Sequence, residues 1–130
     1  PPAAEICRVT NYGSPSTGVR YDGYHEHPVL VYEGFQSQIP LADLLIYLDR
    51  HPLMLPARYS DRVACYNTVY IVSNMPLEEQ YTAEQRINPG AWGDFVRRID
   101  HVVEYLPDGS RLDHKTGELI VPASDKPTAS

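Results

Sequence analysis

The sequence is poor in cysteine and in long apolar runs. It holds two cysteines, Cys7 and Cys65, each in an apolar stretch. Two are too few for a disulfide framework, so we expect buried free thiols, a reducing compartment and a cytoplasmic location. No run approaches the roughly 20 apolar residues of a membrane span. No basic segment followed by an apolar one opens the chain as in a secretory signal. We therefore expect no membrane partner.

The chain also lacks an excess of basic residues and a phosphate-binding loop. Its formal net charge is −6 over 130 residues, which argues against a protein coated in charge for nucleic acid, although a local basic loop is compatible with it. The pattern G-x-x-x-x-G-K-[ST], whose backbone amides cradle phosphates, does not occur. The first residues include no initiator methionine, so we expect a piece of a longer protein, or a processed or engineered chain.

The residues that are present are sufficient for one folded domain. Apolar residues make up 42% of the chain and charged residues 22%, and this length corresponds to a single domain. Ten tyrosines stand against two phenylalanines and one tryptophan. Tyrosine suits half-buried strands and interfaces, where the ring packs and the hydroxyl stays in water.

Strand-like and helix-like patterns alternate along the chain, which favours a mixed α/β domain. Residues 28–33 and 68–73 are apolar on both faces, as in strands of a parallel sheet. Leucines recur at helical spacing in residues 39–50, and Asn88 caps a helix that begins at Pro89. The predicted strands are residues 5–10, 28–33, 53–59, 63–66, 68–73 and 102–106, with residues 119–121 able to pair back, and the predicted helices are residues 39–50, 77–86 and 89–99.

A carboxylate and an amide follow the two most apolar strands. Glu33 ends the first of these strands and Asn74 follows the second. Adjacent parallel strands bring their carboxyl ends to one edge of a sheet, where ligands bind. Many nucleotide hydrolases present metal and water ligands to a phosphate in this way. Taken singly, Glu33 is also an ordinary polar strand end and Asn74 an ordinary turn residue, and an unrelated α/β domain would leave them far apart.

The order of these motifs is specific as a set. The stretches are Tyr21-Asp22-Gly23-Tyr24, Val29 to Phe35, Leu48-Asp49-Arg50-His51-Pro52-Leu53, Pro56-Ala57-Arg58-Tyr59, Ala64-Cys65-Tyr66, Tyr70 to Asn74 and Phe95-Val96-Arg97-Arg98-Ile99. Together they resemble the superfamily 3 helicase domain of rolling-circle replication initiator (Rep) proteins, of the bacterial plasmid and circovirus-like kinds. The resemblance covers about Ile6 to Tyr105.

The resemblance implies a fold and a division of the chain. The fold is a partial AAA+-like sheet of the P-loop NTPase type, with helices and an inserted β-hairpin. Residues 1–106 would form the partial helicase domain, without its phosphate-binding (Walker A) loop. Residues 107–123 would form a turn and hairpin extension, and residues 124–130 a disordered tail.

The resemblance also assigns roles at the sheet edge. Glu33 falls on the first acid of the Walker B strand, which holds hydrated Mg²⁺. Gly34 stands where the family usually has a second acid, and a hydrogen side chain cannot orient a water. Asn74 falls on the sensor position, where an amide can bond both a phosphate and a water. Arg97 and Arg98 resemble the arginine-finger region, and Arg98 is favoured. Both arginines are alternatively surface ion-pair partners of nearby aspartates.

The hairpin would contact nucleic acid. Arg58, Tyr59 and Arg62 lie at its tip, where arginine can pair with phosphate while tyrosine stacks on a base. Asp61 dilutes this charge, and a solvated turn is the alternative. His25 and His27 are spaced like metal ligands, but no further ligand accompanies them, so we interpret them as ordinary loop residues.

The expected function follows from the family. The full-length protein would use ATP and Mg²⁺ to unwind nucleic acid as a hexameric ring on a single strand, with DNA favoured over RNA. This chain lacks the phosphate loop and the second acid, so we expect no hydrolysis and no tight cofactor binding by the chain alone. We also expect self-association. The alternative is a non-enzymatic remnant that binds nucleic acid or forms oligomers.

Overall fold

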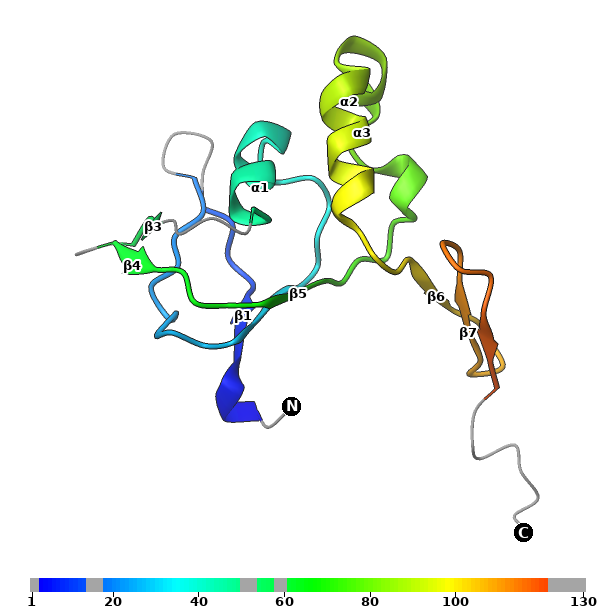
Figure 1. Cartoon of the computed structure of the whole chain (residues 1–130), viewed down its shortest axis with the longest axis horizontal. Coiled ribbons are helices and arrows are strands. Elements are labelled where there is room, and N and C mark those ends of the chain that lie inside the picture. Colours follow the sequence, from blue (N-terminus) through cyan, green and yellow to red (C-terminus); the bar gives the residue numbers. More distant parts are fainter. Residues whose placement is uncertain (1–2, 14–17, 50–53, 58–60, 122–130) are drawn as a thin grey trace, which may run out of the picture. The chain divides into compact units, whose positions relative to one another are not determined.

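The computed structural model describes residues 3–13, 18–49, 54–57 and 61–121. The chain divides into two units, Pro1–Phe95 and Val96–Ser130, and each is described by itself (Figure 1). Three sheets and a few short helices make a mixed α/β structure, as the sequence predicts. None of the helices among the described residues is long and apolar enough to span a membrane. The division of the chain at residue 106 stays a prediction.

A parallel three-stranded sheet forms the centre of the N-terminal unit. A 3-10 turn, η1 (Ala3–Glu5), leads into β1 (Ile6–Val9), which pairs with β2 (Val29–Tyr32), which in turn pairs with β5 (Thr68–Ile71). All four residues of the middle strand β2 are buried, which accounts for its uninterrupted apolar sequence. The three strands predicted at these positions are confirmed.

The connection from β2 to β5 contains a helix and a hairpin. Helix α1 (Leu41–Tyr47) follows Pro40, and its buried residues Leu41 and Leu44 stand one turn apart, as helical spacing predicts. Strands β3 (Met54–Leu55) and β4 (Arg62–Val63) then pair antiparallel, which confirms the predicted hairpin. The tip of the hairpin, residues 58–60, lies outside the described residues.

Two helices follow β5, and the first is shorter than predicted. The expected helix over residues 77–86 is divided into a 3-10 turn, η2 (Leu77–Glu79), and α2 (Thr82–Ile87). Tyr81 interrupts it with a left-handed φ of 50°. Helix α3 (Pro89–Arg98) begins as predicted, because the Asn88 Oδ1 accepts a hydrogen bond from the Ala91 amide at 3.3 Å. Its apolar face buries Phe95.

Tyrosines are more deeply buried than the sequence suggests. Tyr21, Tyr24 and Tyr32 are 1%, 0% and 0% exposed. Their hydroxyls bond within the protein: Tyr21 and Tyr32 bond each other, and Tyr24 donates to the His27 carbonyl. Cys7 is buried as expected, whereas the expectation of burial is wrong for Cys65, which is exposed.

The C-terminal unit contains an antiparallel sheet. Its strands are β6 (Val103–Tyr105), β7 (Arg111–Asp113) and β8 (Leu119–Ile120), paired in that order. Strand β7 is not predicted from the sequence, because Arg111-Leu112-Asp113 carries a single apolar residue. Of the residues predicted to pair back, Leu119 and Ile120 do so, and their partner is β7.

Candidate functional site

The carboxyl ends of β2 and β5 form one edge of the parallel sheet. Their pairing continues beyond the strands, since the Val72 amide donates to the Tyr32 carbonyl at 2.8 Å and the Phe35 amide donates to the Val72 carbonyl at 2.9 Å. Glu33 follows Tyr32 directly, and Asn74 lies two residues after Val72. The backbone thus brings the Glu33 and Asn74 positions to the same edge, as the sequence predicts for adjacent parallel strands. The chemical roles of the two side chains stay predictions.

Glu33 is already engaged by the neighbouring strand. Its Oε2 lies 2.8 Å from the Arg8 Nη1, with the two side chains 35% and 55% exposed respectively. The Tyr12 hydroxyl donates to the Glu33 carbonyl at 2.7 Å. Burial, together with the negative charge of Glu33, raises the pKa of Tyr12 to about 12. The carboxylate is therefore one half of an exposed ion pair that links β1 and β2.

The position after Glu33 needs a glycine for its backbone. Gly34 has a φ of 59°, in the left-handed region, although a Cβ built there would meet no atom within 4 Å. The side-chain Nε2 of Gln38 donates to the Gly34 carbonyl at 2.9 Å, which fixes the turn. Backbone conformation, and not lack of space, thus explains the glycine where the resembling family usually carries a second acid.

Ser73 and Gln80 tie the loops at this edge together, and sequence reasoning missed both. The Ser73 Oγ donates to the Phe35 carbonyl at 2.5 Å and accepts from the Met75 amide at 2.9 Å. The Gln80 side chain, 3% exposed, donates to the Ser73 Oγ at 3.0 Å and accepts from the Ser37 hydroxyl at 2.6 Å. These bonds hold the segment after Glu33 against the segment that carries Asn74. The adjacency of Ser73 to Asn74 is the one sequence signal for this network.

The described residues do not by themselves make a magnesium site. No group of three or more histidine, cysteine, aspartate or glutamate side chains among them is placed to hold a metal ion. Glu33 offers a carboxylate beside the positive charge of Arg8, and Gly34 offers no side chain. Mg²⁺ prefers near-octahedral oxygen ligands, so this set does not fit it. In the loop that carries His25 and His27, the His27 Nδ1 accepts a hydrogen bond from the His25 backbone amide at 3.0 Å.

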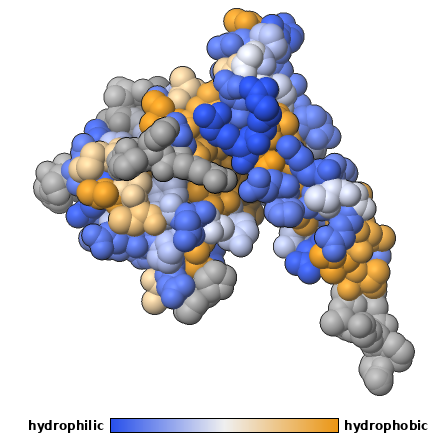
Figure 2. Space-filling view, viewed as in Figure 1, coloured by the Kyte–Doolittle hydropathy of each residue, from blue (hydrophilic) through white to orange (hydrophobic). Residues whose placement is uncertain are grey.

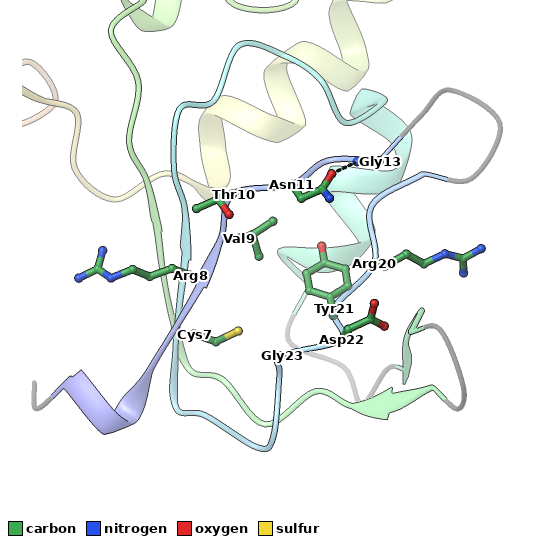
Figure 3. A pocket seen from close by; sticks show the side chains of 10 residues that line it. All are labelled: Cys7, Arg8, Val9, Thr10, Asn11, Gly13, Arg20, Tyr21, Asp22 and Gly23. Atoms are coloured by element: carbon green, nitrogen blue, oxygen red, sulfur yellow. Dashed lines mark hydrogen bonds between the residues drawn. The ribbon is translucent and has the colours of Figure 1, made fainter.

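A hollow of about 500 Å³ lies along β1 rather than at the edge between β2 and β5. Its lining includes Cys7, Val9 and Tyr21 (Figure 3). The Arg8 and Arg20 side chains extend away from its centre in the same view. The lining is polar as well as apolar and includes Asp22, but neither Glu33 nor Asn74 belongs to it, so the hollow does not replace the sheet edge as the candidate site.

The predicted nucleic-acid contacts are only partly within the described residues. Arg58 and Tyr59 lie outside them. Arg62 lies on β4, where its Nη2 donates to the Asp22 carbonyl at 3.3 Å. Its Nε is buried and has no hydrogen-bond partner among the described residues. Arg62 is therefore half-buried against the turn at Asp22.

The two arginines of the predicted finger belong to the other unit. Arg97 and Arg98 end α3 and are exposed. They lie in the C-terminal unit, whereas Glu33 and Asn74 lie in the N-terminal unit. The arginine-finger assignment stays a prediction.

The N-terminal unit is thus a mixed α/β unit whose parallel sheet carries a carboxylate and an amide at its carboxyl edge. No protein-family model matches the chain. The chain is similar to "Replication-associated protein" of porcine circovirus 1, with 32% identity over 72 residues, which are 55% of this chain and 23% of that protein. It is 30% identical to the goose circovirus protein of the same name over 94 residues, 72% of this chain and 30% of the relative.

A third relative is the porcine circovirus 2 protein of that name, 31% identical over 74 residues, 57% of this chain and 24% of the relative. The chain therefore spans less than a third of the length of each of these curated relatives. The similarity confirms the predicted likeness to circovirus replication proteins. A helicase activity and the boundaries of a domain are not part of what these names state.

Proposed function

We propose that this chain is part of the ATPase domain of a replication initiator, of the superfamily 3 helicase type. Its parallel sheet would then be part of an AAA+-like, P-loop NTPase sheet. The observation that carries the proposal is the edge at which Glu33 and Asn74 follow two adjacent parallel strands. The similarity to circovirus replication-associated proteins supports it independently.

Within this function, the edge would face a nucleotide phosphate. Asn74 would hydrogen-bond a phosphate oxygen or a water, because an amide can donate and accept at once. Ser73 and Gln80 would keep the Asn74 segment in register with the segment after Glu33. The described residues do not form a site for Mg²⁺, the ion that the resemblance implies. The phosphate-binding loop would have to come from polypeptide outside this sequence.

The chain by itself should therefore not hydrolyse ATP. A coupled ATPase assay with and without single-stranded DNA measures this directly. We expect turnover at the background level, because Gly34 cannot orient a water and the chain has no phosphate-binding loop. Turnover of even about 1 s⁻¹, a low value for an enzyme, would overturn this part of the proposal. A Gly-Lys-Ser/Thr loop in the reading frame ahead of Pro1 would support the ATPase assignment for the longer protein.

The Arg8–Glu33 ion pair favours a second candidate, a non-enzymatic module that binds single-stranded nucleic acid or forms oligomers. A carboxylate held by arginine is poorly placed to hold a metal ion. For this candidate, filter binding of single-stranded DNA over a salt series should show affinity that falls as salt rises.

The hairpin would carry that binding. Replacing Arg58 and Arg62 together by alanine should abolish it, whereas Arg86→Ala, an exposed position on α2, is the matched control. Equal affinity for the double variant and the control would refute a hairpin contact.

A further inference from the structure

The described part of the C-terminal unit has no apolar core. Its buried residues are Ser110 and Asp113, and every buried apolar side chain of the described residues belongs to the N-terminal unit. The exposed large apolar residues of the C-terminal unit are Val103, Tyr105, Leu119, Ile120 and Val121. Figure 2 shows apolar side chains gathered over this unit. A small sheet with uncovered apolar residues is marginally stable, and such a patch marks an interaction surface.

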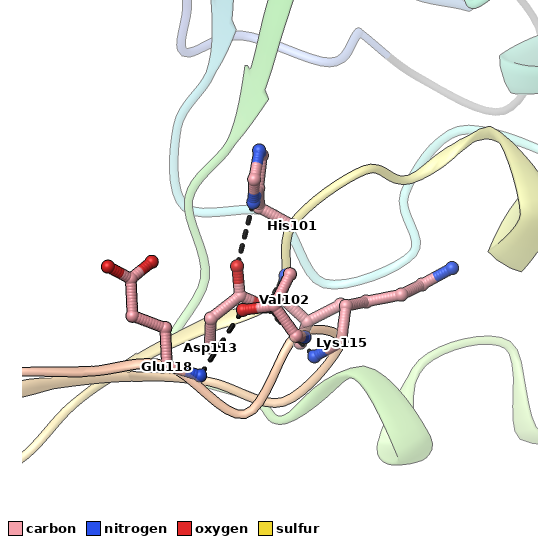
Figure 4. Close-up of polar contacts among 6 residues, drawn as sticks. His101, Val102, Asp113, Lys115 and Glu118 are labelled. Atoms are coloured by element: carbon pink, nitrogen blue, oxygen red, sulfur yellow. Dashed lines mark hydrogen bonds and ion pairs between the residues drawn. The ribbon is translucent and has the colours of Figure 1, made fainter.

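Polar contacts around Asp113 hold the sheet together instead. The Asp113 carboxylate lies 2.7 Å from the His101 Nδ1 and accepts from the backbone amides of Val102 and Lys115 at 3.2 and 2.8 Å (Figure 4). The His101 hydrogen bond, with the backbone amides, holds the pKa of Asp113 well below its usual range. The exposed apolar side chains are thus not needed to fix the turn, and remain available for a partner.

One face of the sheet carries both apolar and charged groups. Tyr105 and Ile120 stand opposite Arg111 on either side, and Val103 stands opposite Asp113. Residues directly opposite each other share a face. We call Val103, Tyr105, Arg111, Glu118 and Ile120 the docking face.

The docking face carries a hollow, a large exposed ring and charges of both signs. It holds a hollow of about 200 Å³, which is lined by Val103, Arg111, Glu118 and Ile120 together with Asp113 and its partner His101. Tyr105, 72% exposed, is not in that lining and is a large side chain able to fill such a hollow on another molecule. Among the described residues, neither the Arg111 guanidinium nor the Glu118 carboxylate has an ion-pair partner. A surface with one free charge of each sign can satisfy both by meeting a copy of itself across a two-fold axis.

The opposite face of the sheet does not have this property. It carries Leu112 and Leu119, which stand opposite each other. Its Glu104 carboxylate already has a hydrogen-bond partner, because the His114 Nε2 lies 2.8 Å from the Glu104 Oε1. Of the two faces, the docking face is therefore the one on which charged side chains, Arg111 and Glu118, lack an ion-pair partner among the described residues.

We propose that the docking face binds the same face of a second copy of this chain, with Arg111 of each copy against Glu118 of the other. This is a closed, two-fold contact, in contrast to the head-to-tail contacts that build a ring. It goes beyond the proposed function, and neither ATP nor nucleic acid takes part in it. Aromatic residues and arginine, both present on the docking face, are enriched in protein interfaces.

Charge exchange tests the contact. Sedimentation equilibrium of the full chain should show a monomer–dimer equilibrium. Arg111→Glu and Glu118→Arg should each weaken it about tenfold or more, because two attractive pairs per dimer become repulsive. Mixing the two variants should restore the dimer, since every cross-pair is then attractive, and the double variant R111E/E118R should also dimerise.

Three controls make the result decisive. Arg86→Glu changes an exposed charge of the N-terminal unit and should leave the equilibrium unchanged. Tyr105→Ser should weaken the dimer without any change of charge, and circular dichroism checks that each variant is folded. A wild-type chain that stays monomeric, single charge variants that dimerise like wild type, or a mixture that stays monomeric would each overturn the proposal. Rings larger than a dimer that survive R111E would do so too.

Discussion

Removing both of two buried hydroxyls that bond each other should destabilise the sheet edge by much less than the sum of the two single losses. Tyr32 is the last residue of β2, directly before Glu33, and its hydroxyl lies 2.7 Å from that of Tyr21. Both residues are at most 1% exposed. Tyr21→Phe leaves the Tyr32 hydroxyl buried without this partner, at a cost of about 1–3 kcal/mol, and Tyr32→Phe does the same to Tyr21. The double variant has no orphaned hydroxyl, so its cost should be well below the sum of the two.

Urea unfolding of the wild type, the two single variants and the double variant gives the coupling energy directly. We expect it to be about 1 kcal/mol or more, because the second substitution removes the group that the first one left unpaired. Tyr70→Phe is the matched control, since that residue is 51% exposed, and it should change the free energy of unfolding by less than about 0.5 kcal/mol. Additive single effects, or single effects as small as that of the control, would refute the reasoning.

Three further predictions concern pH and backbone. Burial raises the pKa of Tyr21 and Tyr32 far above the ordinary 10.0. Their contribution to stability is therefore complete below about pH 10. Above that pH, the free energy of unfolding falls by about 1.4 kcal/mol per pH unit for each of the two tyrosines. Tyrosinate absorbance and circular dichroism, recorded together as the pH is raised, check this. A protein that stays folded while every tyrosine ionises with the ordinary pKa of 10.0 would contradict it. Gly34→Ala should cost about 1–2 kcal/mol in thermal unfolding because the residue has a left-handed φ of 59°. Gly23→Ala should cost less, because that position is in open space and has no such φ. Equal losses for the two variants would exclude strain at Gly34. Asn88→Ala should cost about 1 kcal/mol by removing the cap of α3, and Asn88→Asp should retain most of it; if both variants lose the same stability, the cap is not the cause.

The sequence predicts the parallel sheet well because its signals are local and strong. Strand β2 is apolar on both faces, and the helix after Pro40 has leucines at helical spacing, so each identifies itself without knowledge of its neighbours. Strand β7 could not be predicted in this way. Its three residues show no alternation, and it forms because β6 pairs with it on one side and β8 on the other.

At the candidate site, the sequence predicts positions better than contacts. Parallel pairing is enough to place Glu33 and Asn74 at one edge. The bond from Arg8 to Glu33 joins residues 25 positions apart, and the bond from Gln80 to Ser73 depends on the interruption of the helix at Tyr81. Side-chain contacts of this kind depend on tertiary geometry, which a periodic pattern does not contain.

The two features that oppose catalysis at this edge differ in how easily they are reversed. The Arg8–Glu33 pair is exposed, and such pairs contribute about 0–1 kcal/mol, so a phosphate that attracted Arg8 would release the carboxylate at little cost. The missing side chain at Gly34 cannot be made good in this way, because no rearrangement supplies a carboxylate there. The left-handed backbone at this position also disfavours most other residues. If the longer protein hydrolyses ATP, the group that orients the water must therefore come from a position other than 34. In the proposed function that position would be Asn74, which follows β5 at the same edge of the sheet as Glu33.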